Sequence, residues 1–268
     1  MFNKQTIREL VQRYGLNRKT IKAALAHPPF VARSHKPRPV HLVVDCTFLG
    51  KRGTATAWGV ILFRDAIAKE NLYWSKVYDE RLEHYLCGRQ ELERLGYTIK
   101  SVTSDGFRGL PRVFQGIPFQ HCHFHAIQSV VRYLTKKPQT VAGQVLLALV
   151  KTLPHTNKDD FTNRLMRYWY TYYQFIHEKT IDPYNTRKWT YTHRRLRSAL
   201  HSLRLTLPYL FTYEQDQAIP TTTNTCDGHF SHIKDLLRVH RGLRQQLKYQ
   251  IIHTILLSSS INPNKRKP

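Results

Sequence analysis

After residue 40 the sequence alternates extended apolar runs with helical segments, in an order that limits the fold. Three extended runs come first, followed by a helix, a strand, a short helix, a strand and a longer helix. The predicted strands are residues 40–44, 57–63, 71–77, 99–103 and 119–124. The predicted helices are residues 79–95, with Gly96 as the C-cap, residues 108–114 and residues 125–137. This order predicts an α/β fold.

The first three predicted strands form a meander, as expected for a ribonuclease-H-like core with a mixed sheet. Other α/β domains begin in a similar way, so the order alone leaves them open. We assign residues 40–139 to the first part of this core and residues 140–218 to a mostly helical insertion. Residues 219–268 then supply the C-terminal helices of the core, over residues 225–239 and onward to residue 256.

Aromatic and basic residues crowd the expected helical insertion, above all at residues 168–173 and at Trp189. The aromatic side chains are expected to fill the core of a helical bundle. An exposed aromatic such as Trp189, stacked on a nucleic-acid base, is the alternative.

The first 27 residues are predicted to form a separate helix-turn-helix. Residues 28–39 are rich in Pro and basic residues and are predicted to form a linker. Asn17 is expected to cap the second helix and to contact DNA with it. That helix presents Arg18, Lys19 and Lys22, the side chains that a recognition helix would place in the major groove. A plain helical hairpin with a solvated basic face is the alternative.

The charge balance favours a nucleic-acid partner. Lys and Arg number 42 against 18 Asp and Glu, which gives a net charge of +24 with His neutral. Each phosphate that such a chain neutralises releases condensed counterions, and this release drives binding. The four cysteines form no disulfide-like pattern, and no apolar segment is long enough for a signal peptide or a membrane span. We therefore expect a soluble, intracellular protein without a membrane partner.

Two aspartates follow predicted strands, and a third acid lies near the start of a late helix. Asp45 follows residues 40–44, and Asp105 follows residues 99–103. Carboxylates at the ends of neighbouring strands share one opening and can hold Mg²⁺ or Mn²⁺, although each alone could be a strand-end cap. Asp227 is the candidate third acid, because two divalent ions need bridging and flanking oxygens.

The segment His121–His125 contains a Cys-x-x-His pair, Cys122 and His125. Zinc would need two further ligands, and the other cysteines lie at no suitable spacing. We favour a structural role in which Cys122 is buried as a small apolar residue. His125 would open a helix near the carboxylates and bind a scissile phosphate or orient an acid.

Together these segments resemble the Mutator-type transposases of bacterial insertion sequences. The matching stretches are HLVVDCTFLG, VTSDGFRGLPRVF, QHCHFH and TTTNTCDGHFSHIKDLLRVHRGL. The resemblance covers about three quarters of the chain, and its last stretch is the most specific. It implies three metal-binding acids, at Asp45, Asp105 and Asp227, with Cys122 and His125 as the pair between the second and third acids.

The resemblance implies a transposase that cuts DNA at element ends and joins the freed 3′ ends to target DNA. Its partner would be double-stranded DNA, contacted also by Arg238 and Arg241, and at least a dimer would act in the bacterial cytoplasm, at the nucleoid. A DNA-binding protein without catalysis and a nuclease without strand transfer are the alternatives.

Two departures from the family pattern bear on activity. The family's last acid is typically Glu, so the Asp227 oxygens would sit about 1–1.5 Å further back. The cysteine zinc ribbon that often precedes the helix-turn-helix is not seen in this sequence.

Overall fold

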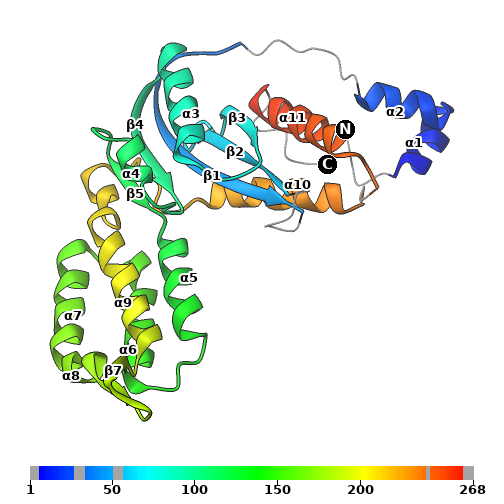
Figure 1. Ribbon diagram of the computed structural model, residues 1–268. Coiled ribbons are helices and arrows are strands. Elements are labelled where there is room, and N and C mark those ends of the chain that lie inside the picture. The colour runs from blue at the N-terminus through cyan, green and yellow to red at the C-terminus, as the bar shows by residue number, and fades with distance from the viewer. Residues whose placement is uncertain (1–5, 27–33, 51–56, 240–241, 262–268) are drawn as a thin grey trace. The chain divides into compact units, whose positions relative to one another are not determined.

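The computed structural model describes residues 6–26, 34–50, 57–239 and 242–261 (Figure 1). Contacts divide the chain into two compact units, and the C-terminal segment returns to the first of them. The first unit comprises Met1–Val102, Gly109–Ile117 and Asn224–Pro268. The second comprises Thr103–Arg108 and Pro118–Thr223. It begins earlier than the expected insertion because the helix after residue 122 packs on later helices of the same unit.

The strands form a five-stranded sheet in the order β3-β2-β1-β4-β5. The strands are β1 (Pro39–Leu49), β2 (Trp58–Asp65), β3 (Asn71–Val77), β4 (Thr98–Ser104) and β5 (Phe119–His121). The first three pair antiparallel, which is the predicted meander. Thr98 is hydrogen-bonded to Arg38, and three residues later on each strand Ser101 is hydrogen-bonded to His41. Residue numbers therefore increase in the same direction on both strands, so β4 runs parallel to β1. The sheet is therefore mixed, as predicted, and it is compatible with an α/β fold.

Both faces of β2 are covered, which explains its continuous apolar run. On one face Val60 and Leu62 pack with residues of α10 (Asn224–Val239) and α11 (Gln245–Ile261). On the other face Phe63 contacts Tyr85 of α3 (Leu82–Arg94) and Phe114, which follows α4 (Leu110–Val113). Leu95, rather than the expected Gly96, is the C-cap of α3, and Gly96 follows it with φ +89°.

At the N-terminus α1 (Ile7–Tyr14) and α2 (Arg18–Ala26) are joined by a turn in which Gly15 has φ +63°. Asn17 Oδ1 accepts the Thr20 N–H at 2.8 Å, so the predicted cap of α2 is present. Of the expected linker, residues 28–33 lie outside the described residues, and Pro39 already belongs to β1.

The second unit is mainly helical and has its own apolar core. Its helices are α5 (His123–Leu134), α6 (Val141–Lys151), α7 (Lys158–Thr171), α8 (Tyr173–His177) and α9 (Arg194–Thr206). Three 3₁₀ turns lie at Leu153–His155, Leu207–Tyr209 and Thr212–Gln215. Tyr168 is buried in this core, whereas Tyr170 is 71% exposed. The aromatic stretch therefore fills the core only in part.

A hairpin of β6 (Lys179–Asp182) and β7 (Asn185–Tyr191) interrupts these helices. Sequence analysis predicted no strands here, because each strand is short and is set by pairing with the other. Trp189 lies on β7 and is 46% exposed.

Candidate functional site

Asp45 lies inside β1, so its prediction as a strand-end residue was wrong. The apolar run stops at Asp45, but backbone pairing continues from Cys46 opposite Ile61 to Leu49 opposite Trp58. Pairing with β2, rather than hydrophobicity, sets where β1 ends. The carboxylate is 6% exposed and accepts the Cys46 N–H at 2.8 Å. A carboxylate is costly to bury in mid-strand, which makes Asp45 a candidate functional residue.

Asp227 lies in the first turn of α10, next to Cys226, which is fully buried against β1. The Cys226 thiol donates to the Val43 carbonyl oxygen at 3.7 Å. Burial raises the pKa of Cys226 well above its ordinary value, and the charges of Asp45 and Asp227 raise it further. Asp45 and Asp227 are distant in sequence, and both belong to the first unit, in which α10 packs on β1.

Arg64, which sequence analysis did not single out, is a buried cation of the same region. It is 3% exposed, it donates to Asn71 Oδ1, and its charge partly offsets the rise in the pKa of Cys226. The sequence feature that could have identified Arg64 is its position within the otherwise apolar run that forms β2.

Asp105 follows β4 directly, as predicted, and belongs to the second unit. Its Oδ1 accepts the Phe107 N–H at 3.3 Å and the Ser104 hydroxyl at 3.2 Å, which fixes the turn after the strand. Gly106 has φ +84°, and a Cβ there would lie 2.0 Å from the His121 ring. Close packing on His121 therefore requires glycine next to Asp105.

Cys122 and His125 lie together with Thr223 in the second unit. Thr223 donates to the Cys122 sulfur from its N–H at 3.4 Å and its hydroxyl at 3.5 Å. The same hydroxyl lies 3.4 Å from His125 Nδ1. Burial raises the pKa of Cys122, but hydrogen bonds from His125 and Thr223 outweigh burial and lower it. The predicted burial of Cys122 is confirmed, although it is a hydrogen-bonded thiol rather than a plain apolar residue.

The helix that His125 was expected to open begins two residues earlier, at His123, with Cys122 as its N-cap. His123 is buried, and its Nε2 lies 2.6 Å from the Leu210 carbonyl oxygen. Burial, followed by the charges of His125 and His123, lowers the pKa of His121 to about 4. His121 is therefore neutral at physiological pH.

The donor chemistry of the three aspartates suits Mg²⁺ or Mn²⁺, which bind oxygen ligands. Within the described ranges, no group of three or more His, Cys, Asp or Glu side chains is placed to hold a metal ion. Within the first unit the structure places Cys226, next to Asp227, against β1, the strand that carries Asp45.

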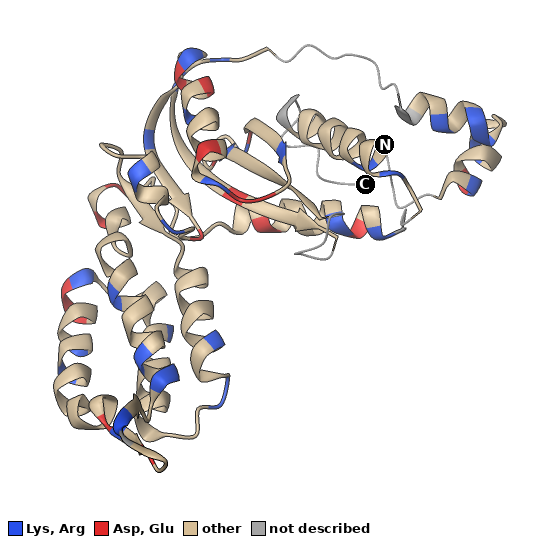
Figure 2. Cartoon of the chain, in the orientation of Figure 1, with Lys and Arg blue, Asp and Glu red and all other residues tan. Residues whose placement is uncertain are grey.

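Most of the predicted DNA-contacting side chains are accessible. Arg18, Lys19 and Lys22 are exposed on α2, and Lys and Arg colour much of α1 and α2 in Figure 2. Arg238, in the last turn of α10, is exposed and lies 3.5 Å from Asp235. Arg241 lies outside the described residues.

A scan against protein-family models finds no match to this chain. A search of curated proteins finds no match either. In the part of the chain that the structure describes, no helix is both long enough and apolar enough to cross a bilayer.

Proposed function

We propose that this chain is a DNA transposase that cuts DNA at element ends and joins the freed 3′ ends to target DNA. The observation that carries the proposal is the packing of α10 on β1, where the Cys226 thiol, next to Asp227, donates to the carbonyl oxygen of Val43, two residues before Asp45. This contact sets the first turn of α10, which carries Asp227, against the strand that carries the buried Asp45. Asp105 adds support, because it directly follows β4, the strand that neighbours β1.

In this proposal Asp45, Asp105 and Asp227 hold Mg²⁺ or Mn²⁺. Bound by these residues, the metal would supply activation of the attacking oxygen and stabilisation of the leaving 3′ oxygen. His125, held by hydrogen bonds to Thr223 and Cys122, binds a phosphate oxygen or orients an acid. The basic helix α2, with Arg238 and Arg241, binds double-stranded DNA.

A ribonuclease-H-like core with a helical insertion is part of the same proposal. The meander, the parallel β4 and the two helices on one face of the sheet support it. Two DNA ends must be held at once, so the active form is at least a dimer, acting in the bacterial cytoplasm at the nucleoid.

The test is nicking and joining of a plasmid that carries the element ends, with Mg²⁺ or Mn²⁺. We expect Asp45→Asn, Asp105→Asn and Asp227→Asn to bind the ends but to lose both nicking and joining. Asp235→Asn, on the solvent side of α10, is the matched control and should retain activity. Nicking without joined products would identify a nuclease without strand transfer.

A DNA-binding protein without catalysis is the second candidate, and the short Asp227 side chain favours it. Tight binding of the ends by an inert wild-type protein would support this candidate and exclude the transposase.

A further inference from the structure

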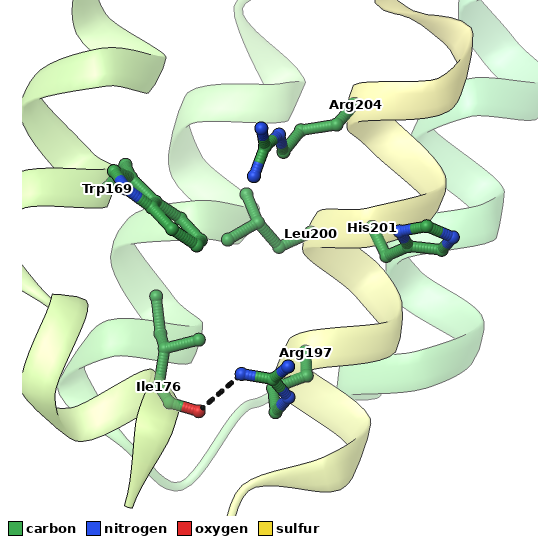
Figure 3. Close-up of a pocket in the computed structure, with 6 residues that line it drawn as sticks. All are labelled: Trp169, Ile176, Arg197, Leu200, His201 and Arg204. Atoms are coloured by element: carbon green, nitrogen blue, oxygen red, sulfur yellow. Dashed lines mark hydrogen bonds between the residues drawn. The ribbon is translucent and has the colours of Figure 1, made fainter.

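One face of α9 forms a small pocket with α7 and α8 in the second unit. Arg197, His201 and Arg204 follow the i, i+4, i+7 spacing that places side chains on one side of a helix. Trp169 of α7 and Ile176 of α8 lie opposite the two arginines (Figure 3), and Leu200 and His201 complete the lining. The cavity measures about 90 Å³, well below the size of a pocket for a whole small-molecule ligand.

Aromatic rings fix the two guanidinium groups of this pocket in place. Arg204 lies over the Trp169 ring, 4.9 Å from its centroid, and Arg197 lies 3.5 Å from the centroid of Tyr191. Arg197 also donates to the Ile176 carbonyl oxygen at 3.3 Å. Because stacking already orders both side chains, binding an anion would cost little additional conformational entropy.

No acidic side chain balances these cations within the described part of the chain. The 13 residues of α9 include four arginines and no acid, and neither Arg197 nor Arg204 has a described carboxylate within 4.0 Å. By contrast, Arg164 of α7 pairs with Asp160 at 2.7 Å. The pocket also has an apolar floor, since Ile176 and Leu200 are 1% and 2% exposed. An anion in this pocket is therefore attracted by two ordered cations above an apolar floor, one on half-buried Arg197 and one on exposed Arg204.

We propose that this pocket binds a phosphate group of a DNA strand, held by Arg197 and Arg204. The planar guanidinium fork matches phosphate oxygens, and the cavity suits a single group rather than a whole nucleotide. The net charge of +24 favours a polyanion over a free anion. The choice of DNA rests on the proposed function, whereas the pocket's preference for phosphate does not.

Binding of a labelled element-end duplex and of a scrambled duplex tests this assignment with the full chain. We expect Arg197→Gln/Arg204→Gln to bind both duplexes about tenfold more weakly, because a charge-assisted hydrogen bond is lost. The slope of log K against log salt should become shallower by about 1, the value for one phosphate contact. Arg164→Gln, which removes one positive charge from the same unit, should leave both quantities unchanged.

His201→Glu provides a second test in case the double variant misfolds. Because His201 is exposed, its substitution should not disturb the fold. The new carboxylate would offset one of the two positive charges of the pocket with both arginines present, and it should weaken DNA binding. Wild-type affinity and slope in both variants would overturn the assignment, as would an equal loss in Arg164→Gln.

Titration with inorganic phosphate separates the two sources of the group. If the pocket binds inorganic phosphate but its variants leave DNA affinity unchanged, it serves a small phosphate and the DNA assignment fails. Because every readout here is binding, a chain that binds DNA through this pocket but never nicks would refute only the proposed function.

Discussion

Thr223 donates both its backbone N–H and its hydroxyl to the sulfur of Cys122, at 3.4 and 3.5 Å. The two residues are far apart in sequence and meet because the segment before α10 returns past β4. A hydrogen bond joins this segment to β4, since the Thr103 hydroxyl donates to the Pro220 carbonyl oxygen at 2.7 Å. The thiol is thus held by the segment that leads into α10, which carries Asp227.

Thr223→Val should raise the pKa of Cys122, because the hydroxyl donor to the sulfur is lost while the backbone donor remains. Ultraviolet absorbance of the thiolate, titrated with pH against a Cys122→Ala blank, measures this change. Loss of a buried hydrogen bond should also cost about 1 kcal/mol of unfolding free energy. An unchanged titration would show that the hydroxyl does not stabilise the thiolate.

Gly106→Ala should destabilise the chain far more than Gly116→Ala. Both glycines have φ +84°, so both variants carry the backbone strain of about 1 kcal/mol. Only at Gly106 would the new Cβ meet the His121 ring, at 2.0 Å, whereas nothing lies within 4 Å at Gly116. Thermal unfolding of the two variants checks this, and equal losses would contradict the close packing on His121.

Stability should fall as the pH drops from 6.5 to about 4, and His121 should account for part of the loss. The folded chain protonates His121 only near pH 4, whereas the unfolded chain does so near 6.5. The unfolded state therefore binds more protons across this window, which costs up to about 3 kcal/mol. Urea unfolding across the window should show a smaller pH dependence for His121→Gln. The same dependence in both proteins would exclude His121 as the cause.

Asp227→Glu should increase nicking if the chain is a transposase limited by its short third acid. The added methylene moves the carboxylate forward by about 1–1.5 Å, and displacements of this size can change rates by about 100-fold. Nicking rates with Mg²⁺ measure the effect, and Asp235→Glu on the same helix serves as the control. A slower Asp227→Glu enzyme would show that the site is adapted to aspartate.

Lys19→Gln and Lys22→Gln should each weaken binding of element-end DNA and reduce the salt slope by about 1. Both side chains are exposed on α2, the helix expected to enter the major groove. Lys100→Gln, which removes an exposed charge on β4, should bind as wild type does. Fluorescence anisotropy over a series of salt concentrations makes the comparison, and wild-type slopes in both α2 variants would support the plain helical hairpin.

Local signals predicted local structure well. The cap at Asn17, the meander and the helical position of Asp227 each depend on a few neighbouring residues, and each was predicted from the sequence. Features that depend on residues distant in sequence were not predicted. The interior position of Asp45 depends on pairing with β2, and the contact of Thr223 with Cys122 depends on the return of a remote segment. The β6–β7 hairpin belongs to the same class, because each short strand is defined by its partner.

The four free cysteines differ in solvent exposure, from exposed to fully buried. Each unit therefore contains a buried thiol whose reaction with a reagent would report local unfolding of that unit. Cys226, held on the Val43 carbonyl of the first unit, and Cys122, held by Thr223 in the second, are both 0% exposed. A thiol reagent can reach Cys226 only when α10 separates from β1, and Cys122 only when the start of α5 opens. Exposed Cys87 sets the rate of the unhindered reaction. Timed alkylation read by mass spectrometry therefore follows the local unfolding of both units separately in one sample.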